Sequence, residues 1–87
     1  MKVSVWDTYV KRSDGRMMHF DIIVSNDLTE KQVVYGYGGK YLRQRQIQSA
    51  AITTNECKFC HIEQATEEMI RQIEENGYYI LEMENCN

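Results

Sequence analysis

The chain of 87 residues has no proline and only three cysteines. Oxidoreductases of the thioredoxin type hold a cis-proline against their C-x-x-C thiols, so the absence of proline weighs against that chemistry. An odd number of cysteines in a reducing compartment indicates free thiols. The cysteine content therefore does not fit a secreted scaffold held together by disulfides.

Blocks of basic residues and long apolar runs are also missing. The net charge is -3, and the lysines and arginines are spread along the chain, whereas a nucleic-acid surface needs a basic stripe. No run reaches the length of a membrane span, and residues 1–7 lack the apolar segment of a secretory signal. We therefore expect a cytoplasmic protein that binds neither nucleic acid nor a membrane.

The composition is otherwise that of a folded protein. Hydrophobic residues make up 43% and aromatic residues 10% of the chain, which is enough for a packed interior. The length fits a single domain over residues 1–87, because a second core would need more chain. A domain of this size buries only roughly 60–65% of its unfolded surface, so a dimer or a bound metal would add to its stability.

The first two elements are predicted to form a hairpin. Residues 2–10 and 17–24 are rich in apolar and β-branched residues, and Asp14 and Gly15 lie between them. Asp-Gly at such a place is typical of a two-residue turn, because both central residues of a type I′ turn need positive φ.

The turn also decides which side chains share a face. A two-residue turn places Arg12 opposite Met17, and one face then carries Val3, Val5, Asp7 and Tyr9 with Met18, Phe20, Ile22 and Val24. The other face would carry Trp6, Thr8 and Val10 with His19, Asp21 and Ile23. A loop longer by one residue would change both sets.

A helix is expected after the hairpin, although glycines interrupt it. Apolar residues recur at helical spacing at Val33, Val34, Tyr37, Tyr41 and Leu42. Asn26, Asp27 or Thr29 is the predicted cap at its start. Gly36, Gly38 and Gly39 each cost about 1 kcal/mol relative to alanine in a helix. The pattern therefore leaves open a kink or break near Gly38.

The remaining elements complete the fold. Residues 46–56 are expected to form a loop or a short edge strand. A second helix follows Thr66, a good N-cap, and ends at Gly77 in the usual left-handed position. Residues 78–84 alternate as a last strand. The predicted fold is α+β with two layers: an N-terminal β-hairpin, then α-β-α-β, a mostly antiparallel sheet and two helices on one face.

Metal, thiol or haem chemistry would depend on the segment Cys57-Lys58-Phe59-Cys60-His61. C-x-x-C-H supplies the two anchors and the axial histidine of c-type haem, but covalent haem is normally attached outside the bacterial cytoplasm. A thiol–disulfide oxidoreductase would use the position just before the second helix, whose dipole favours a thiolate. A hairpin stands where such a fold has its leading βαβ unit.

Zinc binding is the third chemistry for this segment. Cys57 and Cys60 form half of a zinc site that His61, Cys86 or His19 would help to complete. The second pair of ligands that makes such motifs specific is absent. Free cysteines are among the most buried residues, so the alternative is that these thiols pack as small hydrophobic side chains.

Asp7, His19 and Asp21 are the candidate catalytic residues. Carboxylates among apolar neighbours can have a perturbed pKa and act as a general acid or base. In the alternative, structural interpretation these carboxylates cap a turn or bond to a tyrosine or a backbone amide.

Several segments form a specific combination over almost the whole chain: Trp6–Val10, Met18–Ile22, Cys57–Glu63, Ala65–Glu68, Gly77–Ile80, Glu82-Met83 and Cys86. With this combination the chain resembles a family of short bacterial proteins catalogued as a domain of unknown function. The resemblance implies a small α+β domain. The family brings no established activity, so the resemblance assigns no functional residue.

These observations favour a binding or interaction domain without catalysis and without a cofactor. Tyr35, Tyr37 and Tyr41 either pack in the core or form a contact patch between subunits, and the sequence is compatible with a homodimer. Two alternatives stay open: a thiol-redox protein, and a small zinc-binding protein that uses Cys57, Cys60 and His61 or Cys86.

Overall fold

The computed structural model describes residues 1–57 and 65–87 of the chain. Four strands and two helices follow one another as β1 (Val3–Arg12), β2 (Met17–Ser25), α1 (Lys31–Gln44), β3 (Ser49–Glu56), α2 (Glu67–Asn76) and β4 (Tyr79–Glu84). The strands form one antiparallel sheet in the order β3-β1-β2-β4. The predicted α+β class and the predicted order, a hairpin followed by α-β-α-β, are therefore confirmed.

The hairpin loop is one residue longer than the sequence predicts. The amide of Arg12 donates to the carbonyl of Arg16 at 2.9 Å, and Lys11 pairs with Met17. Gly15 alone takes a left-handed conformation in this loop, with φ at 91°. The predicted two-residue turn, and the register derived from it, are wrong.

In the observed register, each side chain of β1 lies on the face opposite to the predicted one, relative to β2. One face now carries Trp6, Thr8 and Val10 of β1 together with Met18, Phe20, Ile22 and Val24 of β2. Asp7 and Tyr9 lie on the other face with His19 and Asp21, because Asp7 pairs with Asp21 and Tyr9 pairs with His19. The face with Met18, Phe20, Ile22 and Val24 is the one that α1 covers, whereas Val5 and Ile23 are buried on the other face.

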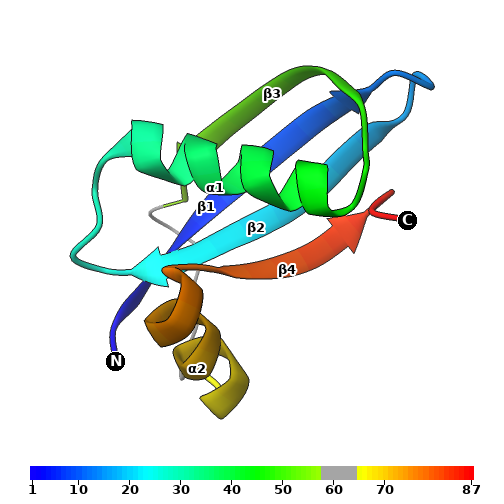
Figure 1. Cartoon of the computed structure of the whole chain (residues 1–87). Helices are drawn as coiled ribbons and strands as arrows, with labels where there is room; N and C mark the ends of the chain where they lie inside the picture. Colours follow the sequence, from blue (N-terminus) through cyan, green and yellow to red (C-terminus); the bar gives the residue numbers. More distant parts are fainter. Residues whose placement is uncertain (58–64) are drawn as a thin grey trace.

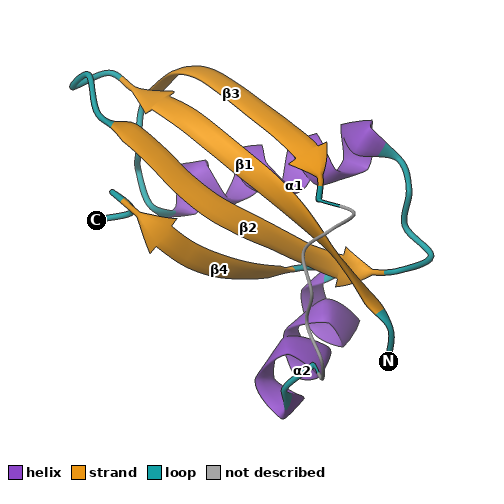
Figure 2. Cartoon of the chain, turned by 180° about the vertical axis from the view of Figure 1, so that it is seen from behind, coloured by secondary structure: helices purple, strands orange, loops and turns teal. Residues whose placement is uncertain are grey.

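Helix α1 lies across this apolar face (Figure 1), and Figure 2 shows the opposite face from behind. The core between α1 and the sheet contains Trp6, Val10, Met18, Phe20, Ile22, Val24, Val34, Tyr41 and Leu42, and Tyr78 and Cys86 join it. Thr8 and Thr54 are buried there too and share a hydrogen bond of 2.8 Å. That bond satisfies two hydroxyl groups that would otherwise be costly to bury.

Helix α1 is continuous through its three glycines, so the break considered near Gly38 does not occur. A Cβ on Gly38 would lie 3.1 Å from Ile52 Cδ1 and 3.3 Å from Ile22 Cδ1. The missing side chain therefore allows α1 to approach the sheet closely. The helix begins at Lys31 with Glu30 at its N-cap, and Glu30 makes no side-chain cap bond. The caps predicted earlier in the chain, between Asn26 and Thr29, are wrong.

Residues 49–56 form an edge strand, one of the two predicted outcomes. Helix α2 lies beside the end of β2 and the start of β4 (Figure 1). Its predicted boundaries are confirmed, because Thr66 Oγ1 accepts a hydrogen bond from the amide of Met69 and Gly77 ends the helix with φ at 93°. Neither described helix is long and apolar enough to span a membrane.

Replacing Gly77 with alanine is expected to destabilise the protein by about 2 kcal/mol. The left-handed conformation costs an L-residue roughly 1–2 kcal/mol. A Cβ at this position would also lie 2.5 Å from Tyr37 Oη. The ring of Tyr37 stacks on the ring of Tyr78, with centroids 4.5 Å apart, so moving Tyr37 aside would disturb this stacking. Urea denaturation measures the loss.

Gly15→Ala is the matched control for this change. Gly15 has φ at 91°, and nothing lies within 4 Å of an added Cβ. Its substitution should therefore lower the free energy of unfolding only through backbone strain, by about 1 kcal/mol. Equal losses for the two variants would show that Tyr37 moves aside without cost.

Candidate functional site

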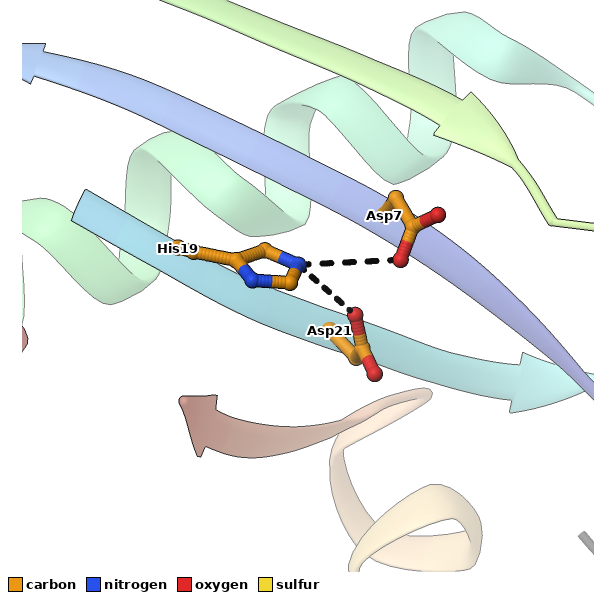
Figure 3. A group of neighbouring side chains, drawn as sticks. All are labelled: Asp7, His19 and Asp21. Carbon is orange, nitrogen blue, oxygen red and sulfur yellow. Dashed lines mark ion pairs between the residues drawn. The ribbon is translucent and has the colours of Figure 1, made fainter. Parts of the chain in front are cut away.

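Three chemically active side chains meet on the sheet face opposite α1. Asp7 comes from β1 and His19 and Asp21 come from β2 (Figure 3). Their ligand atoms all lie within 4.8 Å of one another. His19 Nε2 lies 3.6 Å from Asp7 Oδ1 and 3.4 Å from Asp21 Oδ1. The three candidate catalytic residues are thus brought together, although the predicted register had separated Asp7 from the other two.

Two of the facing atoms are buried without a hydrogen bond. His19 Nε2 and Asp21 Oδ1 have no hydrogen-bond partner within the part of the chain that the structure describes. The ring of Tyr9 stacks on the ring of His19, with centroids 4.3 Å apart and planes 6° apart. This stacking fixes the plane of the imidazole and directs Nε2 towards the carboxylates.

The surroundings of Asp21 disfavour its charged form. Burial raises the pKa of the Asp21 carboxyl to about 6, the facing carboxyl of Asp7 adds to the rise, and His19 opposes it. Burial removes the water that would solvate the carboxylate, and a second carboxylate repels it. The cluster can therefore hold a proton or a cation, since either one relieves this repulsion.

A second feature is a cleft of about 330 Å³ where α1, α2 and β4 meet. It is lined by Lys40, Tyr41, Gln44, Arg45, Glu68, Gln72, Asn76, Tyr78, Tyr79, Ile80 and Glu82. At its α1 wall, Tyr41 Oη donates to Glu82 Oε2, and Arg45 Nη1 donates to the same oxygen at 2.7 Å. Burial and the bond to Glu82 raise the pKa of Tyr41. These side chains are therefore held in place by one another.

The two cysteines that the structure describes, Cys57 and Cys86, do not lie together. Cys86 is a free, buried thiol whose Sγ donates to the carbonyl of His19 at 3.3 Å, which confirms the packing interpretation for this residue. Cys57 follows β3, and its amide donates to the carbonyl of Val5. Val5 pairs with Ile23, whereas Cys86 contacts His19, four residues away on β2. The two cysteines are therefore roughly 13 Å apart along the sheet.

The remainder of the zinc hypothesis lies outside the described residues. Cys60 and His61 belong to residues 58–64, so the structure does not place them. Cys57 itself is disulfide-bonded, which contradicts the expectation of a free thiol at this position. A zinc set that combines Cys57 with Cys86 does not fit the positions of these two residues in the sheet.

The three tyrosines do not form a single surface patch. Tyr35 is 47% exposed, whereas Tyr41 is 7% exposed and belongs to the core. Tyr37 is half-buried and stacks on Tyr78. Core packing is therefore confirmed for Tyr41, and a contact patch made of all three side chains is excluded.

The cleft was not anticipated from the sequence. Its polar lining residues, such as Lys40 and Gln44 on α1 and Gln72 on α2, resemble those of any solvated helix surface. Only the placement of α1, α2 and β4 relative to one another makes these side chains the walls of one cleft. No local pattern marks them.

Residues 1–83 match the model of a family described as Domain of unknown function (DUF2024). The chain belongs to this family. A solved structure, the NMR structure of protein NE1680 from Nitrosomonas europaea, is similar over 100% of both chains, with 40% sequence identity and a TM-score of 0.77. No curated protein matches the chain. The comparisons therefore show the family and the fold, and no activity.

Proposed function

We propose that the protein is a non-catalytic binding domain that takes a small, polar, carboxylate-bearing ligand in the cleft between α1, α2 and β4. The observation that carries this proposal is the cleft itself. Its volume of about 330 Å³ lies at the lower end of the range for small-molecule sites. A ligand the size of an amino acid or a hydroxy acid suits a cleft of this volume.

The charges around the cleft favour an anionic group on the ligand. Arg45 Nη1 forms an ion pair with Glu82 Oε2 at 2.7 Å, and Arg71 Nη2 forms one with Glu68 Oε2 at 2.5 Å. Lys40 is the lining cation that makes no ion pair with any described residue. A ligand carboxylate beside Lys40 would gain a charge-assisted hydrogen bond.

The other walls supply neutral contacts. The amides of Gln44, Gln72 and Asn76 each offer a donor and an acceptor. Tyr78 and Tyr79 add aromatic surface on which the apolar part of a ligand can rest. Such a lining orients a polar ligand without a reactive group.

Binding is favoured over catalysis because the cleft and the titratable cluster are separate. Asp7, His19 and Asp21 do not line the cleft. These three residues lie on the sheet face opposite α1, whereas Tyr41 of the cleft wall belongs to the core under α1. A ligand in the cleft would therefore not reach the cluster.

An NMR titration tests the proposed cleft. A panel of amino acids, hydroxy acids and dicarboxylic acids is added to the ¹⁵N-labelled protein. We expect at least one of these compounds to shift the amide signals of residues 40–45, 72–76 and 78–82. Lys40→Gln should weaken that binding roughly tenfold, since a hydrogen bond to a charged group contributes about 1.5–3 kcal/mol.

Lys11→Gln is the matched control. Lys11 is exposed on β1 and is not part of the cleft, so its substitution should leave the affinity unchanged. Signal shifts confined to other residues, or equal losses in the two lysine variants, would contradict the proposal.

A further inference from the structure

The cluster of Asp7, His19 and Asp21 contains two buried polar atoms that make no hydrogen bond within the described part of the chain. Asp21 is 8% exposed, and its Oδ1 points towards His19 Nε2 without forming a hydrogen bond. His19 Nε2 is also buried without a partner among the described residues. Buried polar atoms normally have a hydrogen-bond partner, and a bound ion is one physical explanation for those that do not.

The distances within the cluster match those between ligands of one metal ion. With ligand atoms at about 2.1 Å from a tetrahedral ion, neighbouring ligand atoms lie roughly 3.4 Å apart. His19 Nε2 lies 3.4 Å from Asp21 Oδ1 and 3.6 Å from Asp7 Oδ1. The ligand atoms of all three residues lie within 4.8 Å of one another.

The local structure also supports a metal site. Two ligands come from one strand at positions i and i+2, and the third comes from the residue paired with Asp21 on the neighbouring strand. Rigid strands hold metal ligands more accurately than loops do. Tyr9 stacks on His19 and fixes the ring that would supply Nε2. The side chain of Asp7 is 36% exposed, so solvent reaches the cluster from that side.

We propose that Asp7, His19 and Asp21 bind one divalent transition-metal ion, with water in the remaining coordination positions. One imidazole nitrogen and two carboxylate oxygens suit Zn²⁺, Mn²⁺ or Fe²⁺. Ca²⁺ prefers six to eight oxygen ligands at longer distances. The ion neutralises the two facing carboxylates and gives His19 Nε2 and Asp21 Oδ1 the partner that the protein does not supply.

Metal titration of the chelator-treated protein tests this site. Isothermal titration with ZnCl₂ should show one ion per chain, and Asp7→Asn and His19→Gln should each weaken binding at least tenfold, as the loss of a direct ligand does. Asp27→Asn, in the exposed turn before α1, is the matched control and should bind like the wild type. The amide spectrum of Asp7→Asn, the most exposed ligand, shows whether that variant remains folded.

Two spectroscopic measurements locate the ion. Mn²⁺ should broaden the amide signals of residues 6–9 and 19–22 first. Co²⁺ should give visible bands without the near-ultraviolet charge transfer that thiolate ligands produce.

Each other outcome overturns the metal site. Zinc binding that Cys57→Ser abolishes and Asp7→Asn leaves intact would place the ion at the cysteine segment. An absence of binding to Zn²⁺ and Mn²⁺ would leave the direct contacts of His19 with the two carboxylates as the explanation of the cluster. Neither outcome affects the cleft, which shares no residue with this site.

Discussion

Replacing Gly38 with valine is expected to destabilise the protein by roughly 2–3 kcal/mol, the upper part of the range for overpacking a core. The Cβ alone would lie 3.1 Å from Ile52 Cδ1 and 3.3 Å from Ile22 Cδ1, and valine adds two methyl groups beyond it. The helix would have to move away from the sheet or force these isoleucines out of their rotamers. For a domain of this length, such a loss lowers Tm by about 10 °C or more.

Gly36→Val provides the matched control on the same helix. Nothing lies within 4 Å of a Cβ on Gly36, and valine has a better helix propensity than glycine by a few tenths of a kcal/mol. We therefore expect this variant to be as stable as the wild type or slightly more stable. Equal losses in both variants, measured by urea denaturation, would show that close packing at Gly38 does not matter.

The helix that contains these glycines shows where propensity alone fails as a guide. Local energetics favour a break at Gly36–Gly39, because glycine weakens a helix. The sheet surface that Gly38 approaches consists of side chains from β2 and β3, which are distant in the sequence. The gain from burying α1 against that surface outweighs the local cost, and no local pattern reveals it.

Elements governed by neighbouring residues could be predicted. Thr66 caps α2 through an amide three residues away, and Gly77 ends that helix by its own backbone conformation. The alternation in residues 78–84 indicated the last strand for the same reason. These signals depend on contacts within a few residues, so a reader of the sequence can find them.

The hairpin register could not be predicted from the Asp-Gly pair alone. Asp14 Oδ1 accepts a hydrogen bond from the amide of Arg16 at 3.0 Å, and Gly15 alone takes positive φ. This is the three-residue loop in which glycine occupies the left-handed position, a common alternative to the two-residue turn. Because side chains alternate along a strand, one additional residue moves Asp7 to the face of His19 and Asp21. The candidate residues could therefore be selected by their chemistry, while their arrangement required the structure.

Stability in the absence of metal is expected to fall as the pH rises through the range in which Asp21 loses its proton. The pKa of Asp21 is raised from its ordinary value of 3.8 to about 6, chiefly by burial. Folding therefore favours the protonated carboxyl, and the resulting stabilisation is complete below about pH 4 and lost above about pH 6.

Asp21→Asn removes this dependence, because asparagine is neutral at every pH. Its free energy of unfolding relative to the wild type should increase between pH 4 and pH 7.5 by up to roughly 3 kcal/mol. Urea denaturation in the presence of a chelator, at several pH values, measures this difference. A difference that stays constant with pH would contradict the raised pKa.

Asp14→Asn is the control with the opposite sign. A backbone hydrogen bond from Arg16, followed by its side-chain hydrogen bonds, lowers the pKa of this exposed carboxyl. The Asp14 carboxylate therefore stabilises the folded protein slightly at a pH above the pKa that Asp14 has in the unfolded chain. This stabilisation is lost as the pH falls through the pKa of Asp14 in the folded protein. Asp14→Asn should therefore be slightly less stable than the wild type at neutral pH and equal to it in acid. If both aspartate variants followed the same pH dependence, a general charge effect rather than the burial of Asp21 would be its cause.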